Sequence, residues 1–141
     1  LLRYFLIVAS RSGQSAGRIS SGANYYHAEL FHKFRMLIEQ KYTELKNVSD
    51  YAGLLHIKAV MLNDISKQVS GLTAGEHIRN RIIIEAKRYL YTTDFSSKEV
   101  AYRLGFEDPH YFSRFFKKYT GQSPQEFKFM SRHESTIVEA G

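Results

Sequence analysis

The sequence predicts an all-α protein in which two helix-turn-helix subdomains are joined by a central linker helix, with about seven helices in all. Three observations support this prediction. Apolar residues recur at helical spacing along most of the chain after residue 24. A sequence unit with a period of about 50 residues occurs twice. Within each copy, residues that favour helix ends divide a short helix from a longer one.

The first 24 residues are expected to lie outside the main domain. Because the sequence begins at Leu1 rather than Met, we expect a fragment that follows a missing N-terminal region. "LLRYFLIVA" is shorter than the ~18 residues of a membrane span, so it is either the end of a dimerisation helix or a disordered stub. Residues 10–24 are rich in Gly and Ser and predict a flexible linker.

The main domain is expected to cover residues 25–132. Its first helix follows from "YYHAELFHKFRMLIEQKY", where Leu30, Phe34 and Ile38 fall on one face. The central helix follows from "AGEHIRNRIIIEAKRYLYTT", where Ile78 and Ile82 begin a second apolar face. Residues 133–141 are expected to form a C-terminal tail.

The repeat defines the two helix-turn-helix units, at about 47–71 and 96–121. "NVSDYAGLLHI" aligns with "SSKEVAYRLGF". After a one-residue insertion, "LNDISKQVSGLTAGE" aligns with "FSRFFKKYTGQSPQE". In this alignment Asp64 corresponds to Arg114, and Ser66 corresponds to Phe116.

Residues that favour helix starts and helix ends occur in both units. The residues predicted to cap helix starts are Asn47, Ser96, Asp108 and Ser123, while Thr73 with Glu76 forms a capping box. The glycines predicted to end helices are Gly71, Gly105 and Gly121. Each unit therefore predicts a short helix, a tight turn and a longer helix.

The longer helix of the second unit carries two kinds of side chain. Its aromatic residues recur at i, i+3, i+4 and i+7, which is the spacing of a buried helix face. They are Phe112, Phe115, Phe116 and Tyr119. The outer arc then carries Arg114, which suits a guanine edge, and Lys117 and Lys118, which suit phosphates. A solvated basic face is the plain alternative, and the duplicated helix-turn-helix weighs against it.

"VAYRLGFEDPHYFSRFFKKYTGQSPQEF" resembles the C-terminal signature of the AraC/XylS family of bacterial transcription regulators. The similarity extends over roughly residues 30–130. It implies a seven-helix domain that binds double-stranded DNA sequence-specifically, with two recognition helices in adjacent major grooves and no cofactor. It also implies a separate N-terminal sensing or dimerisation domain, with RNA polymerase as a further candidate partner.

The resemblance places the DNA contacts by position. In the second recognition helix they are His110, Tyr111, Ser113, Arg114, Lys117 and Lys118; in the first they are Val60, Asn63, Asp64 and Lys67. The first unit departs from the pattern because Asp64 stands at the position that matches Arg114, where family members often have Arg or another polar residue. A carboxylate beside phosphates is repelled unless it accepts a hydrogen bond from a cytosine amino group. The first helix is therefore expected to use Asn63 and Val60, or to bind weakly.

Composition limits the other functions. The 141 residues are 43% hydrophobic, which allows one domain with a core, and the net charge of +6 favours an acidic partner such as nucleic acid or an anionic membrane surface. There are no cysteines, which excludes disulfides and thiolate sites and is compatible with the cytoplasm, where we expect the protein.

An enzyme is disfavoured because no converging site is visible. His27 and Glu29 form H-x-E, but the downstream cysteine pair of a zinc deaminase is absent, and His27 and His32 are poorly spaced for a shared metal. We expect no catalytic residue and no metal site. A protein- or membrane-binding helical module and an RNA-binding domain remain alternatives. A salt titration on duplex DNA against the other ligands separates them.

Overall fold

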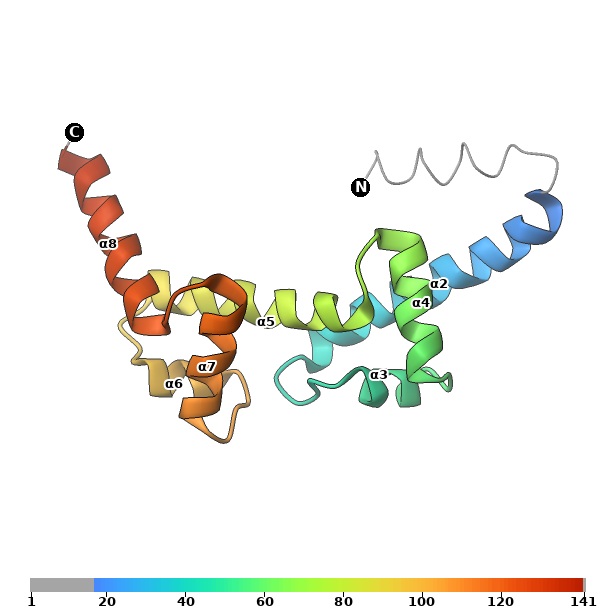
Figure 1. Ribbon diagram of the computed structural model, residues 1–141, viewed down its shortest axis with the longest axis horizontal. Helices are drawn as coiled ribbons and strands as arrows, with labels where there is room; N and C mark the ends of the chain where they lie inside the picture. The colour runs from blue at the N-terminus through green and yellow to red at the C-terminus, as the bar shows by residue number, and fades with distance from the viewer. Residues whose placement is uncertain (1–16, 141) are drawn as a thin grey trace. The chain divides into compact units, whose positions relative to one another are not determined.

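The computed structural model describes residues 17–140, which form seven helices and no strand (Figure 1). The all-α prediction is therefore confirmed for this part of the chain. The helices divide into two compact units. The first contains the described residues up to Gln40 together with Asn47–Ile78, and the second contains Lys41–Lys46 together with the residues from Arg79 onward.

The first unit is built from α2 (Gly17–Lys41), α3 (Val48–Leu54), α4 (Ala59–Ser70) and the start of α5 (Ala74–Thr92). Its core forms because each helix carries apolar residues on one face. Phe34 of α2 meets Tyr51 of α3 edge to face, with ring centroids 5.6 Å apart. Both rings are fully buried, together with Leu62 and Ile65 of α4.

The second unit contains the remainder of α5 with α6 (Ser97–Arg103), α7 (Pro109–Thr120) and α8 (Pro124–Ala140). Phe112 and Phe116 of α7 are fully buried, as their spacing predicted. Phe116 also packs against Phe127 of α8, with ring centroids 5.7 Å apart. Phe115 is only half-buried and Tyr119 is exposed, so the buried face of α7 is narrower than expected.

Most predicted caps are confirmed. Ser96 Oγ accepts a hydrogen bond from the Glu99 amide at 3.2 Å, and Asp108 Oδ1 accepts one from the His110 amide at 2.9 Å. The capping box of α5 and the cap of Ser123 are also present. Gly71, Gly105 and Gly121 all have positive φ. Asn47 lies at the N-cap position of α3 but makes no capping hydrogen bond through its side chain.

Two expected boundaries are wrong because helices extend further than composition suggested. Residues 17–24 were assigned to the flexible linker, but α2 begins at Gly17. Residues 133–140 were assigned to a tail, but α8 continues to Ala140. A helix that has formed extends without a new nucleation cost, and each additional residue adds a hydrogen bond. The predictions for residues 1–16 lie outside the described residues.

Ser66 shows how the first unit accommodates a residue where the second has a ring. Its side chain is fully buried, like that of Phe116. Its hydroxyl donates a hydrogen bond to the Leu72 carbonyl at 2.7 Å, so burial does not leave it unsatisfied. The repeat is therefore preserved in backbone geometry while the packing of its core changes.

Candidate nucleic-acid interface

The exposed face of α7 is basic. The exposed residues among those predicted to contact DNA are His110, Tyr111, Arg114, Lys117 and Lys118. At 100° per residue they share one arc of about 120°, opposite Phe112 and Phe116. The arc carries three cations and no carboxylate. Its chemistry suits a polyanion, with one guanidinium able to make a bidentate contact.

Two residues lie at the edges of this arc. Ser113 is half-buried, and its Oγ lies 3.5 Å from Ser97 Oγ of α6. Tyr111 is 55% exposed, and its ring packs 5.9 Å from that of Phe106. The Tyr111 ring is thereby oriented by the core while its hydroxyl end is available to a partner.

The equivalent arc of α4 has no net charge. Val60 is 72% exposed, and Asp64 and Lys67 are also exposed. Sequence reasoning missed Met61 and Gln68, which are exposed on the same arc. The repeat contained the signal for both, because they correspond to Tyr111 and Lys118.

A shallow hollow of about 360 Å³ adjoins this face of α4. His27 of α2 lines it together with Val60 and Asp64. His27 Nδ1 and Gln68 Oε1 are 3.0 Å apart, at hydrogen-bonding distance. Gln68 is thus restrained by α2, which distinguishes it from Lys118 in the second unit.

Asn63 is placed differently from the prediction. It is half-buried, and its Oδ1 accepts hydrogen bonds from the backbone amides of Ala74 at 3.0 Å and Gly75 at 3.4 Å. These amides belong to the first turn of α5, which has no acceptor within its own helix. The structure therefore gives Asn63 a capping role that the sequence analysis did not anticipate. In the second unit, Ser113 corresponds to Asn63, and Pro124, which has no amide hydrogen, corresponds to Ala74.

We expect Asn63→Ala to lower the free energy of unfolding by about 1 kcal/mol, because the buried Ala74 amide loses its acceptor. Urea unfolding followed by circular dichroism measures this change. Asn63→Asp keeps the acceptor oxygen and should retain most of the stability. The adjacent exposed Asp64→Ala serves as a control that leaves stability unchanged. Equal effects of Asn63→Ala and Asp64→Ala would contradict the capping role.

In residues 17–140 there is no cluster of three or more histidine, aspartate or glutamate side chains that could hold a metal ion. No helix in the same range has the length and apolarity that crossing a bilayer requires.

Comparison with known proteins places this geometry in context. A family profile described as "Helix-turn-helix domain" matches residues 51–129, which is more than half of the chain. The chain is 31% identical over 99 residues to the Bifunctional transcriptional activator/DNA repair enzyme AdaA of Bacillus subtilis (strain 168). That match covers 70% of this chain and 47% of the relative. The chain spans between a third and a half of the length of this and two other curated relatives.

Solved structures share the fold. The C-terminal domain of the two-component response regulator yesN from Fusobacterium nucleatum is 27% identical, with a TM-score of 0.63 over 69% of this chain and 95% of that chain. The DNA-binding domain of AdpA, solved in complex with a target DNA, is 22% identical, with a TM-score of 0.62 over 77% of this chain and 94% of that chain.

Proposed function

Because the chain belongs to the AraC/XylS family of bacterial transcription regulators, we propose that it binds double-stranded DNA sequence-specifically through α4 and α7, which enter adjacent major grooves. The observation that carries this proposal is the outer arc of α7, where Arg114, Lys117 and Lys118 are exposed on a helix held by its buried aromatic face. We propose that these two helices act by binding alone, without a chemical step.

We propose that the two recognition helices contribute unequally. The three cations of α7 supply most of the attraction to phosphates, whereas Lys67 of α4 is offset by Asp64. In α4, Val60 and Met61 offer apolar contact to thymine methyl groups, and Asp64 can accept a hydrogen bond from a cytosine amino group. Asn63 is left out of this base-reading set because its oxygen caps α5.

Selection of bound sequences from a random duplex library, at about 100 mM salt, tests the proposal. Two half-sites one helical turn apart are expected if both helices read bases. A single half-site would restrict sequence reading to one helix, and parallel selections with Arg114→Ala and Asp64→Asn would show which one. Absence of enrichment, together with no salt-dependent binding to duplex DNA, would overturn the proposal.

Asp64→Asn is expected to strengthen non-specific binding to duplex DNA severalfold, because it removes a negative charge from the proposed DNA-facing arc of α4. Fluorescence anisotropy on random-sequence duplexes at several salt concentrations measures this. Glu134→Gln, an equal charge change at an exposed position of α8, is the control and should have a smaller effect. If Asp64→Asn leaves affinity unchanged at every salt concentration, α4 does not approach the phosphates.

The remaining partners belong to the whole protein and are part of the same proposal. A region preceding this chain supplies sensing or dimerisation, and RNA polymerase is contacted at the promoter in the cytoplasm. This extension is supported by relatives named as transcriptional activators, of which the chain spans only a third to a half. Transcription from a promoter containing the selected site, with and without the full-length regulator, tests it.

A further inference from the structure

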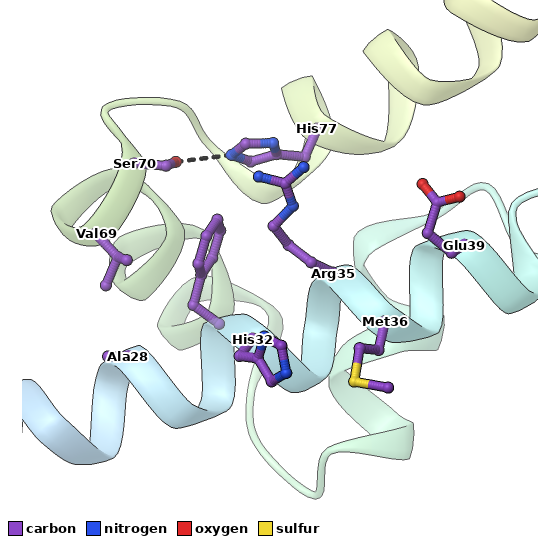
Figure 2. Close-up of a pocket in the computed structure, with 9 residues that line it drawn as sticks. Ala28, His32, Arg35, Met36, Glu39, Val69, Ser70 and His77 are labelled. Carbon is purple, nitrogen blue, oxygen red and sulfur yellow. Dashed lines mark hydrogen bonds between the residues drawn. The ribbon is translucent and has the colours of Figure 1, made fainter. Parts of the chain in front are cut away.

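The first unit contains a cavity of about 630 Å³ beside α2, and none of the residues predicted to contact DNA lines it (Figure 2). It lies between α2, the last turn of α4 and the first turns of α5. Its volume is in the range of sites that hold small organic molecules, which is about 300–1,000 Å³. None of the functions proposed above uses it.

One wall of the cavity is apolar and partly aromatic. Phe31 and Met36 of α2 line it together with Val69 of α4. The Phe31 and His77 rings meet edge to face, with centroids 5.3 Å apart. A flat ring fits such a wall because aromatic rings pack edge to face or offset on one another.

A guanidinium marks the polar part of the cavity. Arg35 is exposed, and its guanidinium carbon lies 6.0 Å from the Phe31 ring centroid. Figure 2 shows the Arg35 side chain extending from α2 toward His77 of α5. Burial and the positive charge of Arg35 lower the pKa of His77, and the carboxylate of Glu76 partly opposes them. The positive charge of Arg35 therefore acts at the end of the cavity that His77 lines.

We propose that the cavity binds a small aromatic carboxylate, with its ring on the Phe31 wall and its carboxylate paired with Arg35. The planar guanidinium can donate two parallel hydrogen bonds to a carboxylate. The lining also includes His32, which is exposed, and Glu39, which lies one turn after Arg35 on α2. The charge of Glu39 disfavours a carboxylate at its own end, so the ligand is oriented with its carboxylate between Arg35 and His77.

The same cavity is connected to the proposed first recognition helix. Val69 and Ser70 form the last turn of α4. The hydrogen bond between Ser70 Oγ and His77 Nε2 is 2.7 Å long and joins this turn to α5 (Figure 2). A ligand that touches Val69 and His77 restrains this junction, and any resulting change in DNA affinity must be reciprocal. Only this coupling rests on the proposed function; ligand binding does not.

The experiment titrates 2-naphthoate into the intact chain and follows the histidine and aromatic signals by NMR, without DNA. The neutral isostere 2-naphthamide is titrated in parallel. We expect saturable shifts at His77 and Phe31, with naphthoate bound about tenfold more tightly than the amide. Arg35→Gln should remove this preference. Lys33→Gln, an equal charge loss on α2 outside the cavity, should preserve it.

Equal affinities for acid and amide, or a preference that survives Arg35→Gln, would overturn the proposed carboxylate site. Absence of saturable shifts at His77 would overturn the site altogether. DNA affinity is then measured with and without saturating naphthoate. A change that Arg35→Gln abolishes supports the coupling. An unchanged DNA affinity with the ligand bound overturns the coupling, while the ligand site stands.

Discussion

Replacing Gly105 with alanine is expected to destabilise the second unit by about 3 kcal/mol or more. Gly105 has a φ of +86°, where a residue with a Cβ is strained by about 1–2 kcal/mol. A Cβ added there would also lie 1.7 Å from the backbone oxygen of Thr43 and 2.8 Å from its carbonyl carbon. Backbone atoms at that distance must move, and overpacking typically costs a further 1–3 kcal/mol.

Gly121→Ala is the matched control for this experiment. Gly121 has nearly the same φ, +83°, but no atom lies within 4 Å of its added Cβ. It should therefore lose only about 1 kcal/mol, the cost of the backbone conformation. Urea unfolding of both variants, followed by circular dichroism, gives the comparison. Equal losses would show that the approach of Thr43 to Gly105 is absent in solution.

The first unit shows that the turn itself does not require glycine, so the expected loss in the second unit comes mainly from the close approach of Thr43 to Gly105. His56 occupies the position that corresponds to Gly105 and has a φ of 58°. The turn of this helix pair therefore tolerates a side chain. In the second unit, by contrast, the segment 41–46 packs against the turn. Lys46 Nζ donates a hydrogen bond to the Thr43 carbonyl at 3.0 Å and lies 4.9 Å from the Phe106 ring centroid.

Local signals in the sequence predicted much of the fold. Caps such as Ser96 and Asp108 act on amides two or three residues away, so a short sequence window contains all the information needed. The buried face of α7 followed from helical spacing in the same way. The contact between Thr43 and Gly105 could not be predicted, because it depends on how a distant segment packs. The start of α2 was missed because glycine and serine content lowers helix propensity without preventing extension, and the end of α8 was placed several residues too early.

In the candidate site, too, local sequence signals predicted some features, while others depend on how distant segments pack. Helical spacing placed Arg114, Lys117 and Lys118 on one exposed arc, and the structure agrees. The family resemblance also placed Asn63 among the DNA contacts of α4, whereas in the structure its oxygen caps α5. That bond joins positions eleven residues apart across a turn, so its presence depends on tertiary packing. Met61 and Gln68 could have been found by carrying the repeat alignment through every exposed position.

Arg114→Ala is expected to weaken binding to the selected duplex by about 1–3 kcal/mol, which is roughly 5- to 150-fold. Arg114 is exposed in the middle of the basic arc and lies in the second turn of α7. Side chains near the N-terminus of a recognition helix are the ones that reach base edges. Truncation to alanine removes the whole guanidinium, so the proposed bidentate contact to guanine would be lost completely. Fluorescence anisotropy on the selected site and on single-base variants measures both affinity and specificity.

Comparing the loss of affinity on the selected duplex with the loss on random DNA distinguishes a base contact of Arg114 from a phosphate contact. If Arg114 contacts a guanine, its removal flattens the preference at one base pair and barely changes binding to random DNA. Arg114→Lys keeps the charge but loses the planar fork, so it should bind random DNA as the unchanged protein does but should not restore the preference. Lys118→Ala, an equal charge loss later in α7, should weaken all duplexes alike and reduce the salt dependence by about one phosphate contact. An equal loss on random and selected DNA for Arg114→Ala would make Arg114 a phosphate contact, and sequence reading by α7 would then have to come from His110 and Tyr111.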